Sequence, residues 1–344
     1  MVLDSSDRKY KILAQIVENY ISTGEPVGSK TICESSDLSF SSATIRNEMA
    51  ELVSYGYLIQ PHVSSGRVPS NRGYRLYINR LMPEKPLESD EKSIINGALS
   101  SASMDPEDLL EAAADILAEI TGFTAVMTTP LNQNSKILSI KFVQISRRGG
   151  MLVLVTSSGM VKNKLFRLEY DLNEEILKMF EKMLEEEFKG KFLSEITPET
   201  VDILAPSAVS TPMMLFPIMK VFLEAVKEAY EVKVKICGQK NLLSIPGINL
   251  ETVIDIFNFL DEKEKVLNLF SKEKYGVNFI VGEENEYQQL KNSSICFSRY
   301  SVAERFGFLG IIGPTRMDYS NVNAKLRYIS LLVGVFLERI LKGY

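Results

Sequence analysis

The chain has 344 residues, enough for two or three domains of the usual size. Its hydrophobic fraction of 45% and charged fraction of 24% are those of an average globular protein, which excludes extensive disorder and a fibrous repeat. The net charge of −5 is unevenly distributed, since residues 1–82 carry 9 Lys or Arg and 8 Asp or Glu, whereas the rest carries 30 and 36. The N-terminal segment is therefore the part suited to a polyanion.

The first 83 residues have the pattern of three helices followed by a hairpin. Apolar residues recur at helical spacing in three segments before Gly56. A strand at 57–59 then turns at Pro61 and returns along the chain. This order predicts a winged helix-turn-helix DNA-binding domain over 1–83. Prolines and charged residues then predict a linker over 84–104.

The third predicted helix and the turn after it carry side chains suited to DNA. Residues 43–80 contain 5 Arg, no Lys and 2 Glu, and guanidinium groups bind phosphate and guanine edges with two hydrogen bonds. Near the start of the helix we expect Arg46 to suit guanine and Asn47 to suit adenine, while residues of the turn hold phosphates. A protein–protein module with a solvated helix is the alternative. The predicted DNA-binding residues are Ser41, Ser42, Thr44, Arg46, Asn47, His62, Ser65, Arg67, Arg72 and Arg75.

Beyond the linker, strands surround an apolar, mainly helical segment. Helices are predicted at 105–121, 173–188, 213–230, 251–270 and 321–341, and strands at 137–146, 150–156, 161–167, 232–236, 278–281, 294–300 and 307–312. The simplest interpretation is a discontinuous domain, 105–194 and 275–344, interrupted by an inserted domain over 195–274.

The helix predicted over 213–230 is apolar on almost all sides. Such a helix must be buried, either within its own domain or against another subunit, and periodicity alone favours neither. Because a protein that reads an inverted repeat needs a two-fold dimer, the insertion is a sensible dimer surface. The predicted dimerisation residues are Met213, Met214, Phe216, Met219 and Phe222.

The sequence gives little support to a catalytic or metal site. His62 is the only histidine, so a Ser-His-Asp or histidine–metal site would have to be built in the predicted turn. The Gly-rich segment 306–321 ends at a helix start but lacks the P-loop ending and the GxGxxG spacing, which favours a buried strand with a tight turn over a phosphate site. We expect no enzyme activity, no cofactor and no metal.

Cysteine usage and hydropathy predict the compartment. Cys33, Cys237 and Cys296 are odd in number and widely spaced, which fits unpaired thiols in a reducing environment. The N-terminus is charged without an apolar signal region, and the apolar stretch 329–337 is too short to span a bilayer. We therefore expect a cytoplasmic protein.

Three motifs resemble the family of the heat-inducible transcription repressor HrcA: ATIRNEMAELVSYGYLIQPHVSSGR at 43–67, VPSNRGYRLYI at 68–78 and IGPTRMDY at 312–319. The resemblance implies an α+β multidomain protein with an N-terminal winged helix-turn-helix, a GAF-like domain and an inserted α/β dimerising domain. It also implies a dimeric repressor of the chaperonin and Hsp70 operons that binds an inverted-repeat operator called CIRCE. The chaperonin GroEL would keep it active, and heat shock would relieve repression. The alternative is a ligand-gated transcription regulator that senses a small molecule through the GAF-like domain.

Overall fold

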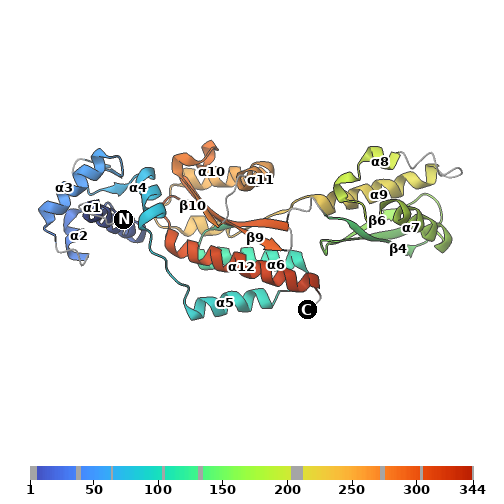
Figure 1. The fold of residues 1–344 in the computed structure, drawn as a ribbon. Helices are drawn as coiled ribbons and strands as arrows, with labels where there is room; N and C mark the ends of the chain where they lie inside the picture. The colour runs from blue at the N-terminus through green and yellow to red at the C-terminus, as the bar shows by residue number, and fades with distance from the viewer. Residues whose placement is uncertain are drawn as a thin grey trace.

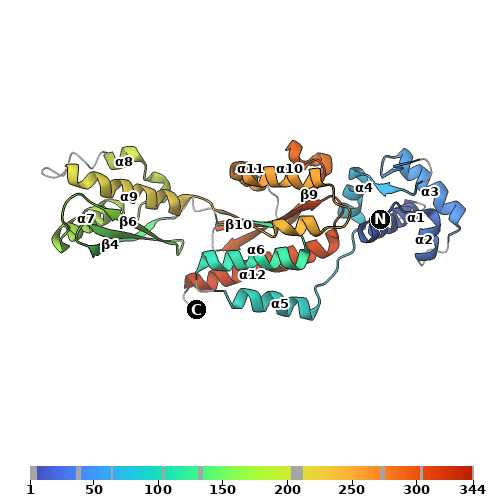
Figure 2. The same ribbon diagram turned by 180° about the vertical axis from the view of Figure 1, so that it is seen from behind.

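The protein is a mixed α+β chain of three units in a row, each with its own sheet (Figure 1). The N-terminal unit lies at one end, a five-stranded sheet in the middle and a three-stranded sheet at the other end, and the view from behind shows the same order (Figure 2). The computed structural model describes residues 6–35, 40–62, 65–102, 105–130, 135–202, 212–271, 276–302 and 305–342.

The N-terminal unit consists of helices around a small two-stranded sheet. Its elements are α1 (Ser6–Thr23), α2 (Ser29–Ser35), α3 (Ser42–Ser54), β1 (Leu58–Ile59), β2 (Val68–Pro69), α4 (Asn71–Leu76) and the π-helical turn η1 (Tyr77–Leu81). Ile45, Met49 and Leu52 lie on one stripe of α3 and are buried, because residues three and four apart share a helix face. Each such side chain contributes about 1.5–3 kcal/mol when fully buried. The order of elements matches the sequence prediction.

The middle unit is an antiparallel sheet with helices on both faces. Its strand order is β7-β3-β10-β9-β8. The strands are β3 (Thr124–Thr128), β7 (Val234–Cys237), β8 (Val277–Val281), β9 (Ser293–Val302) and β10 (Arg305–Pro314). The helices and short turns are α5 (Ser89–Ser100), α6 (Pro106–Thr121), η3 (Gln239–Ser244), α10 (Leu250–Asp261), α11 (Lys263–Ser271), η4 (Gly282–Glu284), η5 (Gln288–Leu290) and α12 (Tyr319–Lys342). Helices α6 and α12 cover one face, and α10 and α11 lie over the other (Figure 1).

The segment 84–104, expected as a linker, is only partly a linker, because it contains α5. The Glu91 carboxylate accepts a hydrogen bond from the Glu88 amide at 3.3 Å at the start of this helix. Ile95 and Leu99, four residues apart, are buried against the core of the middle unit. Two apolar positions in a polar segment are too weak a pattern to distinguish a docked helix from a linker.

The unit at the far end is the insertion, and its bounds differ from those expected. It comprises β4 (Ile137–Ser146), β5 (Gly149–Thr156), β6 (Val161–Arg167), α7 (Glu174–Phe188), η2 (Leu193–Glu195), α8 (Pro198–Asp202) and α9 (Pro212–Tyr230). Its strands form a separate sheet, whereas β7, α10 and α11 belong to the middle unit. The division at 195–274 is therefore wrong, and the interruption covers about 135–230. A strand pattern indicates a strand but not the sheet that it joins.

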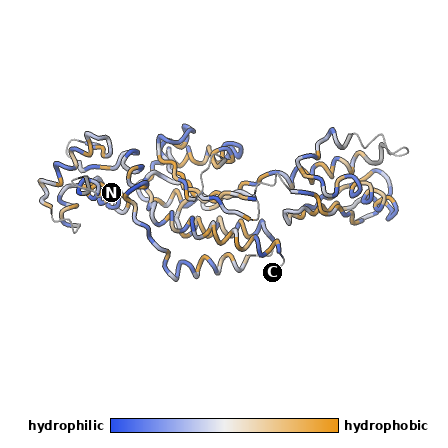
Figure 3. Tube along the Cα trace, in the orientation of Figure 1, coloured by the Kyte–Doolittle hydropathy of each residue, from blue (hydrophilic) through white to orange (hydrophobic). Residues whose placement is uncertain are grey.

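The hydrophobic cores follow these units with one exception. The inserted unit has a core of its own, while the N-terminal unit shares one continuous core with the α6 and α12 side of the middle unit. Figure 3 shows apolar residues along α6 and α12, which pack against each other and the sheet. Within the described residues, every helix is too short or too polar to cross a membrane.

Candidate nucleic-acid interface

The start of α3 presents two polar side chains to solvent and uses its hydroxyls internally. Ser41 caps the helix, its Oγ accepting from the Thr44 amide at 3.1 Å and lying 2.9 Å from the Thr44 hydroxyl. Ser42 is tied to Ser29 of α2 by a 3.0 Å hydroxyl contact. Arg46 and Asn47 are exposed, and within the described part of the chain their side chains make no hydrogen bond. The hydroxyls therefore fix the helix start, which leaves two side chains free for a ligand.

The acidic residues of α3 are neutralised from α1. Glu48 is buried and accepts from Arg8, with the Arg8 Nε at 2.8 Å from its Oε1. Glu51 pairs with Lys9, and the hydrogen bond to Glu51 raises the pKa of Lys9. These ion pairs remove the two negative charges that would oppose a polyanion near Arg46. Arg8 and Lys9 are absent from the sequence prediction, because no local pattern reveals which helix faces their charges.

The turn between β1 and β2 is built by the residues predicted there. The Ser65 hydroxyl donates to the His62 carbonyl at 2.7 Å and accepts from the His62 amide at 2.9 Å. Arg67 pairs through its backbone with Val27, and its guanidinium donates to the Ser65 carbonyl at 3.2 Å. A Cβ at Gly66 would lie 2.6 Å from the backbone that precedes α2, so only glycine permits this approach. His62 is exposed and Arg67 is half-buried as a brace of the turn.

Arg72 and Arg75, one turn apart on α4, have different environments. Arg72 is exposed and lies over the Tyr57 ring, 5.3 Å from its centroid. Arg75 instead points to the middle unit, where its Nε donates to Glu284 at 2.7 Å and its Nη2 to the Phe279 carbonyl at 2.7 Å. The hydrogen bond to Glu284 raises the pKa of Arg75. In this arrangement the Nε and Nη2 of Arg75 are engaged within the protein, and its predicted contact with DNA stays a prediction.

Of the predicted dimerisation residues whose side chains are described, two are buried and one is exposed. Met219 and Phe222 are buried in the core of the inserted unit, where the Phe222 ring lies 4.9 Å from that of Phe188. These two side chains therefore fit the first of the two possibilities that periodicity left undecided, a helix buried within its own domain. Phe216 is 69% exposed, and the side chains of Met213 and Met214 lie outside the described residues.

The Gly-rich segment 306–321 holds no phosphate cradle. Most of it is β10, paired with β3 and β9 inside the sheet. The Asp318 carboxylate accepts from the Asn321 amide at 3.1 Å, so a negative group already occupies the start of α12. Within the described residues, no group of three His, Cys, Asp or Glu side chains is placed to hold a metal ion.

A small helical unit with exposed arginines and paired acids, joined to a larger α+β body, is an arrangement that we expect of a DNA-binding transcription regulator. Comparison with known proteins identifies which. The family described as HrcA protein C terminal domain matches residues 107–322, so the chain belongs to the HrcA family of heat-inducible transcription repressors. It is similar to the heat-inducible transcription repressor HrcA of Lachnoclostridium phytofermentans, with 33% identity over 328 residues, 93% of this chain and 94% of that protein.

Two further comparisons agree. The HrcA repressor of Ruminiclostridium cellulolyticum is 35% identical over 338 residues, which cover 96% of each chain. A solved structure described as a hypothetical protein at 2.2 Å resolution has a TM-score of 0.69 at 24% identity, over 97% of this chain and 99% of that chain. The solved structure shows that the fold extends over nearly the whole chain, and the sequence relatives show the repressor family.

Proposed function

We propose that the N-terminal unit is a winged helix and that α3 is its recognition helix. The observation that carries this proposal is the exposure of Arg46 and Asn47 beside acids already paired with α1. A helix of this size fits the major groove, where arginine donates to guanine and asparagine pairs with adenine. His62 and Arg72 flank the helix from the turn and from α4, where they would contact phosphates.

Paired substitutions test this division of roles. Arg46→Ala should weaken binding to an inverted-repeat operator by about 1–3 kcal/mol and leave a scrambled duplex nearly unaffected. Arg72→Ala should weaken both duplexes similarly and reduce the slope of log K against log salt by about 1. Fluorescence anisotropy at several salt concentrations measures both effects. An equal loss on both duplexes for Arg46→Ala would contradict a base-reading role.

We also propose that the repressor binds its inverted repeat, of the CIRCE type, as a homodimer formed by the inserted units. Their three-stranded sheet has helices on one face only (Figure 1). The strand register places six apolar side chains on the other face, with Leu165 73% exposed, and a seventh, Ile145, is 58% exposed at the irregularity beside them. A second copy would cover such a patch symmetrically. These side chains are Val143, Ile145, Met151, Val153, Val155, Val161 and Leu165.

Sedimentation equilibrium tests this surface. Leu165→Asp should convert the dimer to a monomer at micromolar concentration, because a buried unpaired carboxylate opposes association. Phe216→Asp, on the exposed part of α9, is the matched control and should leave the dimer intact. A dimer that tolerates Leu165→Asp and dissociates with Phe216→Asp would place the interface on α9.

The family resemblance further suggests that a chaperonin of the GroEL type keeps the repressor active on chaperone operons until heat shock. Adding chaperonin and ATP to purified protein should then raise the fraction that binds the operator. The fraction of protein able to bind is measured by titrating it with operator duplex at a concentration well above Kd. No gain in this fraction would contradict this part of the proposal.

The alternative, a small-molecule sensor, has a physical obstacle. In the middle unit the face under α10 and α11 is filled by aromatic side chains, with the Phe270 ring 5.2 Å from that of Phe297 and 6.1 Å from that of Phe308. A ligand there would have to displace a packed core. A metabolite that releases the operator at submillimolar concentration would nevertheless favour the sensor.

A further inference from the structure

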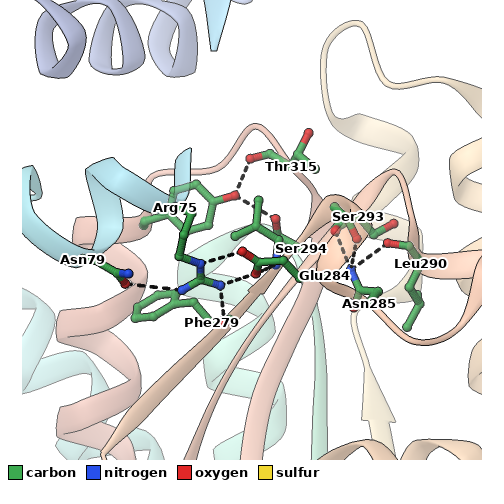
Figure 4. A network of polar contacts seen from close by, with 12 residues as sticks. Arg75, Asn79, Phe279, Glu284, Asn285, Leu290, Ser293, Ser294 and Thr315 are labelled. Atoms are coloured by element: carbon green, nitrogen blue, oxygen red, sulfur yellow. Dashed lines mark hydrogen bonds and ion pairs between the residues drawn. The ribbon is translucent and has the colours of Figure 1, made fainter. Parts of the chain in front are cut away.

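The N-terminal unit is attached to the middle unit by a bidentate ion pair at α4. The Arg75 Nε donates to one oxygen of Glu284 at 2.7 Å, and Nη2 donates to the other (Figure 4). Nη2 also donates to the Phe279 carbonyl on β8, and the Glu284 carboxylate accepts from the Val281 amide at 2.9 Å. The Arg75 guanidinium thus binds a side chain, Glu284, and a backbone carbonyl, that of Phe279. This geometry restricts rotation of the guanidinium and of α4 against the middle unit.

Aromatic packing continues this contact into the buried core. The Tyr74 ring, beside Arg75 on α4, lies 5.7 Å from that of Tyr319, which in turn lies 6.1 Å from Phe279. The Tyr319 hydroxyl is held by the Ser294 hydroxyl at 2.7 Å and donates to the Thr315 carbonyl at 2.5 Å. Tyr319 belongs to the IGPTRMDY motif, so this segment packs against the N-terminal unit.

A second residue of that motif lies close to the end of α1. Arg316 donates to the Pro246 carbonyl at 2.5 Å. A Cβ at Gly24, which has φ +77° and follows α1, would lie 2.6 Å from the Arg316 guanidinium. A cation at this position is favourable, because the helix C-terminus carries partial negative charge. The two units therefore meet at two separate points, the ion pair at α4 and the close approach of Arg316 to the end of α1.

Shared packing makes these two units one body. Their buried side chains form a single continuous cluster, whereas the inserted unit has a separate core. If the N-terminal unit were joined to the middle unit only through its linker, the buried side chains of each unit would form a separate core. The orientation of α3 is thus set by the packing and contacts at this junction, which include those at α4, and not by the linker alone.

We propose that Arg75 is a positioning residue which, through Glu284, fixes the angle of α3 to the five-stranded sheet and so sets the half-site spacing that two copies accept. This inference rests on the proposed function. A dimer with rigidly held recognition helices binds both half-sites only at the matching separation, since the second binding event gains its effective concentration from that geometry. Loosening the angle lowers this gain and broadens the accepted spacings.

The experiment uses the full-length chain and synthetic duplexes that carry the inverted repeat with its natural spacer, with one, two or five base pairs added, or with one half-site alone. The variants are Arg75→Ala, Glu284→Gln and the charge-reversed pair R75E/E284R. Lys85→Ala is the matched control, because its 3.4 Å ion pair with Asp318 crosses the same junction between exposed side chains.

Both single variants should bind the natural spacer about tenfold more weakly, keep their half-site affinity within about twofold, and discriminate less between spacers. The charge-reversed pair should recover part of the spacer preference, and Lys85→Ala should behave as wild type. Glu284→Gln keeps the shape of the side chain, so it remains informative if Arg75→Ala unfolds, which circular dichroism would reveal.

Three results would overturn the inference or its basis. Unchanged spacer preference in both variants, with wild type selective, refutes the positioning role while leaving the proposed function intact. A matching loss on the half-site for Arg75→Ala alone makes Arg75 a direct DNA contact instead. Wild-type protein that does not distinguish the repeat from scrambled DNA refutes the proposed function itself.

Discussion

Replacing Phe222 by alanine provides a direct test of how the inserted unit is packed. Phe222 is fully buried, and its ring lies 4.9 Å from that of Phe188 within the separate core of this unit. Removing the ring costs its transfer free energy and leaves a cavity, together about 3–5 kcal/mol. Because a domain is stabilised by only about 5–15 kcal/mol, this change consumes a large part of the stability of the unit.

Hydrogen exchange on the full-length chain measures the effect unit by unit. For Phe222→Ala, the slowest amides of β5 and α9 should exchange about two to three and a half orders of magnitude faster, since 1.4 kcal/mol corresponds to tenfold. Amides of β10, in the other core, should keep their rates. Phe216→Ala, at a 69% exposed position, is the control and should change stability by no more than about 0.5 kcal/mol. If Phe222→Ala left exchange unchanged but dissociated the dimer, the burial argument would be refuted and α9 would be the dimer surface.

Three further outcomes follow from groups whose surroundings are known. Tyr319→Phe removes both hydrogen bonds of a buried hydroxyl and should cost about 1–3 kcal/mol in urea unfolding; a neutral result would contradict the network. Burial raises the pKa of Glu107, but hydrogen bonds from two lysines outweigh it and lower the pKa, so this carboxylate stabilises the fold above its unfolded pKa of about 4.3 and loses that contribution as the pH falls through the lower folded value. Glu107→Gln should therefore destabilise the protein at pH 7, and the difference should disappear only once the pH has fallen below the lowered folded pKa of Glu107; a deficit that is independent of pH would argue against this linkage. Iodoacetamide at pH 8 should modify exposed Cys33 well before Cys237, because burial first, then Asp115, raises the pKa of Cys237 to about 12; faster labelling of Cys237 would be inconsistent with this environment.

Local patterns predicted most of the elements correctly, because they depend on neighbours within a few residues. The apolar spacing of α3 and the break at Gly56 are visible in the sequence, and both occur in the structure. The sequence also predicts the long C-terminal helix and two strands, and the structure has them as α12, β9 and β10. Strand β3, which is buried along its whole length, has no alternation and was not predicted.

Assignment to sheets and surfaces could not be predicted in this way. The strands β4 to β6 and the strand β7 are all visible as strands in the sequence, yet they join different sheets, because pairing depends on where the chain crosses between units. For the same reason periodicity could not decide whether Phe222 faces a second subunit or its own core, and the structure buries it in the core of the inserted unit.

The sequence by itself determined the family, the polar face of α3 and the presence of arginines around it, since motif, charge and helical period are all local properties. Only the tertiary structure decided what each charge does. Glu48 and Glu51 are neutralised by a helix some 40 residues away, and Arg75 binds Glu284, 209 positions further along the chain. Electrostatic effects depend on distance in space and on burial, and neither is written in the order of residues.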